Sequence, residues 1–471
     1  MRTMTARNPR TGKQDYAFEA WEAGDVAAAG ERLRAAQPGW QAMGPERRAE
    51  IMTAWADALR ADGAALLDAL IADTGRTAIA KQEVAATLAT MARWAGAAPR
   101  LLRTEARRSA VFETIRLDAR WHPYPLVGVI APWNFPLLLS LIDAIPALMA
   151  GCAVIVKPSE VTPRFAGPLA DSLPDSLAKV LTIAPGDGEA GAAVVETVDA
   201  VAFTGSVATG RRVGEAAARR FIPAHLELGG KDPAVVLASA DVAVAAKALL
   251  RGSCVGTGQA CQSIERIYVA DAVADAFTEA LVAEAKATPL SAEDPRRGIV
   301  GPLIFERQAA IIQGQLDDAH AKGAKALTGG KVREVGGGLY LEPTVLTGVT
   351  NDMAVMTEET FGPVMPVMRF SGVDEAVRLA NGGVFGLSAC VFGAEDEAIA
   401  VAERLDAGGV SINDAALTSM VFEQEKDSFG LSGLGRSRMG DSGLTRFLRK
   451  KALFVQEGSP IPMAAFAEGS A

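Results

Sequence analysis

The spacing of apolar residues changes along the chain and predicts a different structure in each part. Between residues 25 and 102 the chain is rich in Ala, and Ile51, Trp55 and Leu59 recur every four positions. This spacing places the three side chains on one face of a helix. We therefore expect amphipathic helices in this part of the chain, packed against a sheet.

Short apolar runs alternate with Ala-rich, helix-like stretches through most of the remaining chain. The expected strands cover residues 153–156, 181–183, 200–203, 233–237, 266–269, 339–345, 366–370, 389–392 and 409–412. Buried strands that alternate with helices are typical of parallel βαβ units. The pattern predicts an α/β fold with two doubly wound domains. Two segments fall outside the alternation: residues 111–121 are expected to form a hairpin outside the main sheets, and residues 450–457 form a strand-like run.

Size and charge narrow the class of protein. A chain of 471 residues is too long for a single hydrophobic core, so two or three domains are expected. The net charge is −9, with acidic and basic residues interspersed, which argues against a nucleic acid or an anionic membrane as partner. The longest apolar stretch, residues 137–152, is interrupted by Asp143 and Pro146 and is too short to span a bilayer. The N-terminus lacks an apolar targeting segment, so a cytoplasmic protein is expected.

Cysteines and histidines bear on redox state and metal binding. The four cysteines are widely scattered, which favours free thiols in a reducing compartment. The three histidines form no cluster with Cys, Asp or Glu at the spacing of metal ligands, so no metal site is expected. These residues are Cys152, Cys254, Cys261, Cys390, His122, His225 and His320. His225 lies close to Glu227 in sequence, and a packing or hydrogen-bonding role is expected for it.

One thiol and one carboxylate stand out because of the residues around them. Cys261 ends the small-residue turn Gly258-Gln259-Ala260-Cys261, and Glu227 lies in Leu226-Glu227-Leu228-Gly229-Gly230. A substrate can approach such a thiol closely, and a nearby carboxylate can act as its base or activate a water. A lone Cys is more often a small buried apolar residue, so the pair alone does not decide between catalysis and packing.

Four further segments carry polar residues in distinctive surroundings. They are Pro132-Trp133-Asn134-Phe135-Pro136, Lys157-Pro158-Ser159-Glu160, Phe203-Thr204-Gly205-Ser206 and Glu358-Glu359-Thr360-Phe361-Gly362-Pro363. Gly and Ser at the start of a helix leave backbone amides free to face a phosphate. Together with the two segments above, these four resemble the signature blocks of the NAD(P)-dependent aldehyde dehydrogenase superfamily. The resemblance covers about residues 8–457.

The resemblance implies a fold and a division into domains. It implies an aldehyde dehydrogenase-like fold with a Rossmann-like cofactor domain, a catalytic domain and a small β element for oligomerisation. The implied boundaries are 1–104 and 123–229 for the NAD-binding domain, 230–428 for the catalytic domain, and 105–122 with 445–471 for the oligomerisation element. Members of the superfamily assemble as dimers or tetramers, so a homodimer or homotetramer is expected.

The resemblance also implies a reaction and three catalytic residues. Cys261 would add to the aldehyde, and the Asn134 amide, with the backbone N–H of Cys261, would bind the resulting oxyanion. Hydride transfer to the nicotinamide would leave a thioester, and Glu227 would deprotonate the water that hydrolyses it to the carboxylic acid.

A nicotinamide cofactor and its binding residues follow from the same blocks. Lys157 and Glu160 would contact the adenosine ribose. Glu359 would hold the nicotinamide ribose, with Phe361 packed beside the ring. Gly188 stands in a G-x-G-x-x-G run, which a tight turn explains equally well. The implied cofactor residues are Trp133, Lys157, Ser159, Glu160, Gly188, Phe203, Gly205, Ser206, Leu228, Glu359 and Phe361. A carboxylate at Glu160 repels a 2′-phosphate, which favours NAD, with NADP also possible.

Substrate identity is less well defined. The chain has Gly256 where the superfamily usually has Asn, and residues 425–430 replace the usual Pro-Phe-Gly-Gly run. Trp133 and the adjacent apolar residues Leu137 and Leu138 suggest an aromatic or medium-chain aldehyde. The alternatives are a semialdehyde, with Arg251 or Arg438 receiving its carboxylate, and a CoA-acylating relative, which Glu227 argues against. A protein without catalytic activity on the same scaffold is the alternative from another class.

Overall fold

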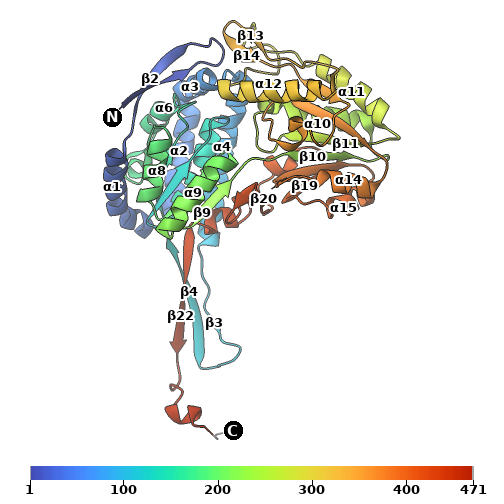
Figure 1. The fold of residues 1–471 in the computed structure, drawn as a ribbon. Coiled ribbons are helices and arrows are strands. Elements are labelled where there is room, and N and C mark those ends of the chain that lie inside the picture. Colours follow the sequence, from blue (N-terminus) through green and yellow to red (C-terminus); the bar gives the residue numbers. More distant parts are fainter. Residues whose placement is uncertain (1, 469–471) are drawn as a thin grey trace.

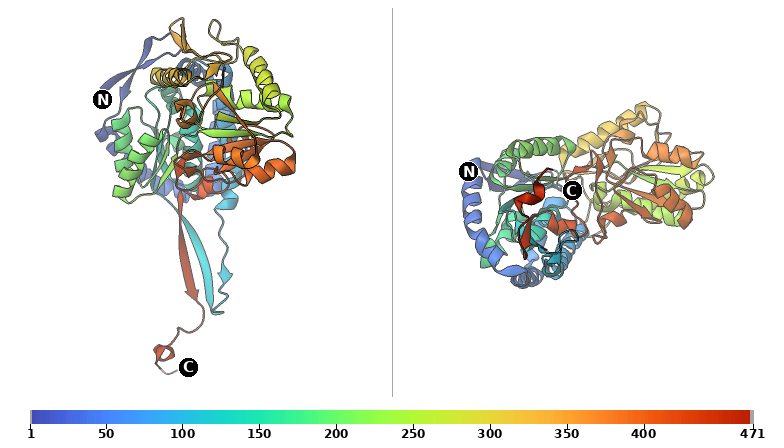
Figure 2. Two further views of the ribbon diagram at one scale, coloured as in Figure 1. Left: turned by 45° about the vertical axis from the view of Figure 1, so that its right-hand side comes forward. Right: turned by 90° about the horizontal axis from the view of Figure 1, so that it is seen from below.

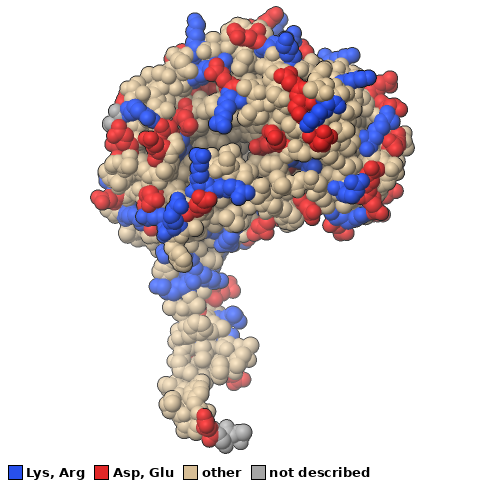
Figure 3. All heavy atoms as spheres, in the orientation of Figure 1, with Lys and Arg blue, Asp and Glu red and all other residues tan. Residues whose placement is uncertain are grey.

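A computed structural model of the chain describes residues 2–468 and consists of a head and a projecting stem. The head contains two large sheets flanked by helices, and the stem is a narrow ribbon of strands (Figure 1). The view from below shows the two halves of the head side by side (Figure 2). Lys and Arg alternate with Asp and Glu over the head and are the main charges where the stem leaves it (Figure 3).

The first sheet contains five parallel strands and one short antiparallel strand. In spatial order they are β21 (Gly433–Leu434), β9 (Ala224–Glu227), β8 (Ala200–Thr204), β5 (Leu126–Ile130), β6 (Ala153–Lys157) and β7 (Leu181–Ile183). Every residue of β5, β6 and β8 is buried, as their continuous apolar runs predict for parallel strands covered by helices. The strand order reverses between β5 and β8, which is the arrangement of a Rossmann fold.

The helices of this half come mainly from the N-terminal third of the chain. They are α1 (Ala23–Ala42), α2 (Gly44–Asp62), α3 (Ala64–Thr74), α4 (Thr77–Leu101), α5 (Pro136–Ala150), α6 (Ala166–Asp171), α7 (Asp175–Ala178), α8 (Gly188–Thr197), α9 (Val207–Arg220) and α16 (Ser442–Thr445). The prediction of a buried helical face is confirmed, because Ile51, Trp55 and Leu59 all lie in α2 and are buried.

The second sheet contains six parallel strands and the antiparallel edge strand β12. In spatial order they are β12 (Lys325–Ala326), β15 (Thr344–Thr347), β16 (Val364–Phe370), β11 (Ile264–Ala270), β10 (Asp232–Val236), β18 (Ser388–Phe392) and β19 (Gly409–Ile412). Side chains alternate between its faces, so Val235 enters one apolar cluster and Val236 another. The helices of this half are α10 (Val242–Cys254), η1 (Val255–Gly258), α11 (Ala274–Lys286), α12 (Glu306–Ala321), α13 (Ala354–Thr357), α14 (Val373–Ala380), α15 (Glu395–Ala402) and η2 (Leu417–Ser419).

The stem is a three-stranded antiparallel sheet. Its strands are β22 (Leu448–Gln456), β4 (Ile115–Pro123) and β3 (Arg107–Arg108), and the tail beyond it contains η3 (Met463–Phe466). β4 pairs with β22 along its whole length, from Ile115 opposite Gln456 to Pro123 opposite Leu448. The expected hairpin at residues 111–121 is therefore corrected: residues 111–114 form a turn, and the long partner of β4 comes from the end of the chain. The hydroxyl of Ser109 closes that turn by accepting from two backbone amides.

The alternation of strands and helices expected from the sequence is confirmed, with local differences. The run at residues 339–345 is divided by a segment containing Pro343, which has no N–H to donate to a ladder. Strand pairs that the sequence did not predict are β1 (Arg2–Arg7) with β2 (Gln14–Ala20), β13 (Arg333–Val335) with β14 (Gly338–Tyr340), and β17 (Phe385–Gly386) with β20 (Phe429–Gly430). The domain boundaries drawn from the sequence stay predictions. No helix formed by residues 2–468 has the length and apolarity needed to cross a membrane.

Candidate active site

A cavity of about 100 Å³ lies where loops from the two halves of the head meet. The lining residues are Pro132, Trp133, Asn134, Leu139, Thr204, Gly205, Ser206, Leu228, Gly229, Cys261, Gln308, Glu359 and Phe361. Two of the three predicted catalytic residues, Cys261 and Asn134, belong to this set. So do six of the predicted cofactor residues: Trp133, Gly205, Ser206, Leu228, Glu359 and Phe361.

One side of the cavity is formed at the carboxyl ends of the parallel strands of the first sheet. Ile130 of β5 pairs with Lys157 of β6 and Phe203 of β8, and Thr204 of β8 pairs with Glu227 of β9. The register therefore brings the ends of four strands to one edge. Open α/β sheets bind ligands at such an edge, at the point where the strand order reverses. The segments that follow β5 and β8 meet at this point, and both line the cavity.

The loop that carries Cys261 has an unusual backbone. Gly256, Thr257 and Gly258 have φ values of 63°, 67° and 68°. A Cβ at Gly258 would lie 2.4 Å from the carbonyl carbon of Gly362, so only Gly fits there. The buried side chain of Gln259 anchors the loop, because its Oε1 accepts from the backbone amide of residue 304 at 2.9 Å. The loop is thereby held in one conformation beside the cavity.

Cys261 differs from the other three cysteines in its surroundings. It is partly exposed, whereas the other three are buried. Burial raises the pKa of the Cys261 thiol to about 12; the charge of Glu227 acts in the same direction and that of Arg438 in the opposite one. The thiol in this state therefore keeps its proton at neutral pH, and the nucleophilic thiolate has to form when the site is loaded.

Glu227 lies at the end of β9, beside the main cavity. Its backbone carbonyl accepts from the amide of Gly205 at 3.1 Å, which ties it to the turn after β8. Its carboxylate Oε1 is 3.8 Å from Nε of Arg438. The residue lines a second cavity of about 10 Å³ rather than the main one. Its charge nevertheless affects Cys261, as the thiol pKa indicates.

Asn134 is buried in the turn between β5 and α5, and several contacts hold it there. Its Nδ2 donates to the backbone carbonyl of Gln259 at 2.9 Å. Its own carbonyl accepts from Arg76, which also donates to the carbonyl of Gly256 at 2.6 Å. The carboxylate of Glu83 accepts from the first amides of α5, including that of Leu137 at 2.7 Å. One of the two Nδ2 protons is thus used in fixing the amide, and the other remains for a ligand.

The turn that carries Glu359 and Phe361 rests on a buried ion pair. Glu265 binds Nζ of Lys231 at 2.7 Å, and both side chains are nearly inaccessible to solvent. The same carboxylate accepts from the amides of Thr360 and Phe361, each at 2.7 Å. Phe361 has a φ of 54°, a left-handed value that is strained for a side chain of this size. The ion pair therefore fixes a backbone that would not adopt this turn by itself.

Glu359 faces the turn after β9 across the cavity. A Cβ at Gly229 would lie 2.5 Å from both carboxylate oxygens of Glu359, so a side chain there would displace that carboxylate. Burial raises the pKa of Glu359 to about 8; the charge of Glu265 adds to this effect, while the hydrogen bond from the amide of Gly230 opposes it. The rings of Trp133 and Phe361 meet edge to face, with centroids 5.3 Å apart, and form an apolar wall.

The other five predicted cofactor residues do not line this cavity. Lys157 is buried at the end of β6, and its Nζ is 2.9 Å from Oε2 of Glu160. The hydroxyl of Ser159 accepts from the amide of Val161 at 3.2 Å. Gly188 begins α8, where a Cβ would meet nothing within 4 Å, and Phe203 is buried near the end of β8. Lys157 and Phe203 share the strand-end edge with the cavity, because both pair with Ile130.

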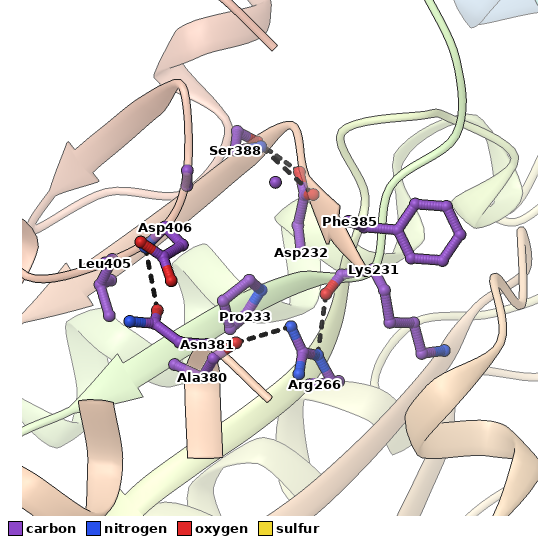
Figure 4. A pocket seen from close by; sticks show the side chains of 12 residues that line it. Lys231, Asp232, Pro233, Arg266, Ala380, Asn381, Phe385, Ser388, Leu405 and Asp406 are labelled. Atoms are coloured by element: carbon purple, nitrogen blue, oxygen red, sulfur yellow. Dashed lines mark hydrogen bonds between the residues drawn. The ribbon is translucent and has the colours of Figure 1, made fainter. Parts of the chain in front are cut away.

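A smaller cavity, of about 10 Å³, lies at the amino ends of β10, β11 and β18 (Figure 4). Arg266 donates there to the backbone carbonyls of Lys231 and Ala380, at 2.8 and 2.9 Å. Asp232 accepts from the hydroxyl and amide of Ser388, and burial raises the pKa of Asp232 to about 7. These contacts support the segment that leads from Gly229 into the second sheet.

Sequence reasoning missed Arg76, Glu83 and Glu265 as supports of the site. All three are charged residues that the structure buries, and Glu265 stands in a strand-like run. Buried charges of this kind need partners, which was the available signal. The partners lie far away in the sequence, however, and could not be identified from it.

The two arginines considered as receptors for a substrate carboxylate are already paired. Arg251 binds Asp414 and the carbonyl of Ala415, and Arg438 binds Asp143. Neither lines the main cavity.

His225 packs its ring against Phe447 and accepts from the amide of Arg436, as expected. Burial lowers the pKa of His225 to about 3. Within residues 2–468 no group of three or more His, Cys, Asp or Glu side chains is arranged to hold a metal ion.

Comparison with known proteins identifies the family. The family model described as "Aldehyde dehydrogenase family" matches residues 1–453. The chain belongs to the aldehyde dehydrogenase family. It is therefore an oxidoreductase that acts on aldehyde groups, as the sequence predicted.

Individual aldehyde dehydrogenases with known structures resemble the chain closely. The structure of the putative aldehyde dehydrogenase PutA from Anabaena variabilis is 52% identical, with a TM-score of 0.96, and the match covers 98% of this chain and 99% of that one. The structure of betaine aldehyde dehydrogenase from Staphylococcus aureus in complex with NAD+ is 28% identical, with a TM-score of 0.90, over 98% and 93% of the two chains. The predicted fold class is thus confirmed.

Relatives known from their sequences carry different substrate names. A Mycolicibacterium smegmatis protein named putative succinate-semialdehyde dehydrogenase (NADP(+)) is 38% identical over 449 residues, which are 94% of this chain and 87% of that protein. The 4,4'-diapolycopene aldehyde oxidase of Methylomonas sp is 39% identical over 383 residues, which are 79% and 68% of the two chains. Relatives of nearly equal identity therefore differ in the aldehyde that their names specify.

Proposed function

We propose that the chain oxidises an aldehyde to the carboxylic acid with a nicotinamide dinucleotide, through a thioester on Cys261. The observation that carries this proposal is the shared cavity of Cys261, Asn134 and Glu359, with Glu227 beside it. Cys261 supplies a nucleophile and Asn134 a donor for the oxyanion. The two carboxylates differ in their surroundings: Glu227 supplies a base, and Glu359 a ligand for ribose hydroxyls.

The residues around the cavity fit a nicotinamide dinucleotide. Gly205 and Ser206 lead into α9, a helix of 14 residues whose N-terminal amides suit a phosphate. The space that Gly229 leaves in front of Glu359 gives the carboxylate access to a ribose. When bound, the cofactor supplies the acceptor for the hydride that leaves the substrate carbon. The Glu160 carboxylate, next to Lys157, supports NAD as the preferred form, although relatives are named for NADP(+) and NAD+ appears in related structures.

In the acylation half of the reaction, Cys261 forms the bond to substrate. The thiol gives up its proton to solvent water, the sulfur adds to the aldehyde carbon, and the carbonyl electron pair moves to oxygen. The second Nδ2 proton of Asn134 and the backbone amide of Cys261 stabilise that oxyanion. The oxygen regains its double bond as hydride leaves, and Cys261 is left as a thioester.

In the deacylation half, Glu227 acts on water. Its carboxylate takes a proton from a water molecule, and the oxygen of that water adds to the thioester carbon. The C–S bond then breaks, which releases the carboxylic acid and returns the sulfur of Cys261. Glu227 supports hydrolysis over transfer to CoA because it provides the base that hydrolysis requires.

For the substrate we propose an uncharged aromatic or medium-chain aldehyde. Trp133, Leu139, Leu228 and Phe361 give the cavity apolar surface, and none of the lining residues is Lys or Arg. The similarity to a diapolycopene aldehyde oxidase, named for an aldehyde, is compatible with this class. A semialdehyde with a carboxylate is the second candidate, because the Mycolicibacterium smegmatis relative carries that name.

Two variants test the chemistry. Cys261→Ser should lower kcat by about 10⁴-fold or more, since a hydroxyl is a poor nucleophile without a thiolate-like charge. Glu227→Gln should still release one round of NADH rapidly and then stall as thioester, which mass spectrometry detects on Cys261. An undiminished rate of NADH formation by the Ser variant would show that the proposed reaction is wrong.

Steady-state kinetics with hexanal, benzaldehyde and succinic semialdehyde distinguish the two substrate classes. The proposal expects the highest kcat/KM for one of the uncharged aldehydes. A higher kcat/KM for succinic semialdehyde would favour the second candidate. The same assays with NAD and NADP give the cofactor preference.

We also propose that copies of the chain associate through the stem as a homodimer or homotetramer. β22 is paired on one side only in the single chain, and Phe454 on it is 74% exposed. A strand with a free edge and an exposed aromatic side chain is suited to pairing with a second copy. A monomer in light scattering at micromolar concentration would contradict this. The cytoplasmic location expected from the sequence stays a prediction.

A further inference from the structure

Arg438 lies against Glu227 at the end of β9, beside Thr204 of the main cavity lining. It comes from the loop between β21 and α16, which follows the second sheet in sequence but packs on the first. Its Nε is 3.8 Å from Oε1 of Glu227. The resemblance that implied a role for Glu227 implied none for Arg438. The sequence suggested Arg438 only as an alternative receptor for a substrate carboxylate.

Two other contacts fix the guanidinium of Arg438. Its NH2 donates to Oδ2 of Asp143 at 3.0 Å and to Oγ1 of Thr204 at 2.6 Å. Asp143 is buried on α5, and its other oxygen accepts from Arg446. Thr204 pairs with Glu227 across β8 and β9, so the same guanidinium contacts both strand ends. Arg438 is therefore held in place by residues that do not take part in the proposed chemistry.

The remaining nitrogen that faces Glu227 has no partner among the described residues. Nε of Arg438 is buried and forms no hydrogen bond in the part of the chain from 2 to 468. A distance of 3.8 Å is too long for a hydrogen bond but short enough for an ion pair. A shift of the Glu227 carboxylate by about 1 Å would complete the bond. An unsatisfied buried donor carries a free-energy cost, and the carboxylate is the group placed to remove it.

The charges around Glu227 balance only when Arg438 is counted. The buried carboxylate of Asp143 and the partly exposed one of Glu227 face two guanidiniums, Arg438 and Arg446. Although burial alone would lower it, the pKa of Arg438 is raised by the charges of Asp143 and Glu227, so the side chain stays charged. Without Arg438, Glu227 would lose the only ion pair that the described residues give it.

We propose that Arg438 is a positioning residue for Glu227. Hydrolysis of the thioester depends on Arg438 more strongly than formation of the thioester does. The inference rests on the proposed function, since it assigns to Glu227 the activation of water. The orphan Nε–H of Arg438 faces the carboxylate and holds it on one side of the site. There it can take a proton from water as the water oxygen bonds to the thioester carbon and the C–S bond breaks. Arg438 itself touches neither substrate nor cofactor.

The test separates the two half-reactions in rapid-mixing experiments with NAD and the better of hexanal and benzaldehyde. Arg438→Gln should leave the first turnover of NADH fast, at about one NADH per site, and slow the steady state by about 10- to 100-fold, a fraction of what a general base contributes. Acyl-enzyme should then accumulate on Cys261. Hydroxylamine condenses with aldehydes, so it is added after unreacted aldehyde has been removed; it should then release the acyl group as a hydroxamate and return the free thiol of Cys261.

Arg446→Gln is the matched control. Arg446 binds the same Asp143 and its charge also acts on Glu227, but it forms no ion pair with Glu227, so this variant shows the effect of losing the buried pair and a nearby charge without the contact to Glu227. It should lower the thermal midpoint to a similar extent and leave the ratio of first-turnover to steady-state rate near that of the parent. Arg438→Lys should recover part of the steady-state rate, because it keeps the charge without the Nε–H. If Arg438→Gln does not fold, the Lys variant carries the test, with an intermediate slowing of deacylation expected.

Two results would overturn the inference. One is a steady-state rate in Arg438→Gln and Arg438→Lys equal to that of the parent. The other is an equal loss of first turnover and steady state without accumulation of acyl-enzyme on Cys261, which would make Arg438 a purely structural residue. Glu227→Gln distinguishes this failure from that of the proposed function. If it stalls as acyl-enzyme while the Arg438 variants do not, only the role of Arg438 is wrong.

Discussion

The two walls of the cavity are built in opposite ways. The first wall lies at the carboxyl ends of parallel strands, where Asn134 follows β5 and Ser206 follows β8. The second lies at the amino ends of strands, where Cys261 precedes β11 and Glu359 precedes β16. The carboxyl ends of a parallel sheet are the usual place for a ligand. The amino ends are not, and the second wall needs supports of another kind.

The difference shows in what holds each wall. In the first, strand register and the start of a helix place the residues, as with Thr204 beside Glu227. In the second, the backbone has left-handed φ values at Thr257 and Phe361, and a buried ion pair holds the turn. A wall that no sheet positions is thus stabilised by charged groups inside the protein, which tolerate little change. This contrast leads to three predictions, in order of decreasing effect.

Removing the charge of Glu265 should affect stability most. Glu265→Gln leaves the ammonium of Lys231 buried without a counter-ion, so the stability of the folded protein should fall by about 3–5 kcal/mol. On the first wall, Ser206→Ala removes only the cap of α9 and should cost about 1 kcal/mol. Urea denaturation of both variants, followed by fluorescence, compares the two. Similar midpoints would mean that the walls are not stabilised differently.

Replacing one glycine in each wall by alanine should give a smaller difference in stability between the walls. Gly258→Ala has to adopt a φ of 68° and would place its Cβ 2.4 Å from a backbone carbon, whereas Gly205→Ala meets the ring of Phe203 at 2.6 Å without a left-handed φ. The first should lose about 1–3 kcal/mol, with a fall in kcat as Cys261 shifts. The second should lose less, because a ring can move more readily than a backbone. Thermal midpoints and kcat of the two variants provide the measurement.

The last prediction concerns the pH dependence of stability, a change of slope rather than a loss at one pH. The pKa of Glu359 is about 8 in the folded protein, against 4.5 for an unperturbed glutamate side chain. The folded state therefore keeps a proton that the unfolded chain releases, and stability falls as pH rises between those two values. Glu359→Gln should show a shallower decline of the thermal midpoint from about pH 5 to about pH 9. Parallel curves for parent and variant would mean that Glu359 is ionised throughout.

The sequence predicted the first wall better than the second for the same physical reason. Apolar runs and a following Gly or Ser are local patterns, so the strands and the turn at Gly205 could be found. Cys261 stood out by its small-residue turn, but its role, like that of Glu359, came only from the resemblance to family blocks. Their supports escaped notice because an ion pair such as Lys231 with Glu265 joins residues on different strands.

The sequence also did not reveal which segments, far apart in the chain, pair with one another. β21 was not predicted as a strand, because two residues carry no periodicity. The contact between Arg438 and Glu227 depends on where that strand pairs. The prediction of one strand at residues 339–345 was wrong for a simpler reason, because Pro343 interrupts the ladder within this apolar run.

The return of the chain end to the first sheet has a consequence for synthesis. β9 gains its outer neighbour β21, and Asp143 its two arginines, only after the entire second sheet has been made. A nascent chain leaving the ribosome therefore carries a half-finished N-terminal layer, with an open strand edge and an uncompensated buried carboxylate, until its last tenth emerges. Such contacts, distant in sequence, form late and slowly. Translation that stops early would yield a species prone to aggregation rather than a working half-enzyme.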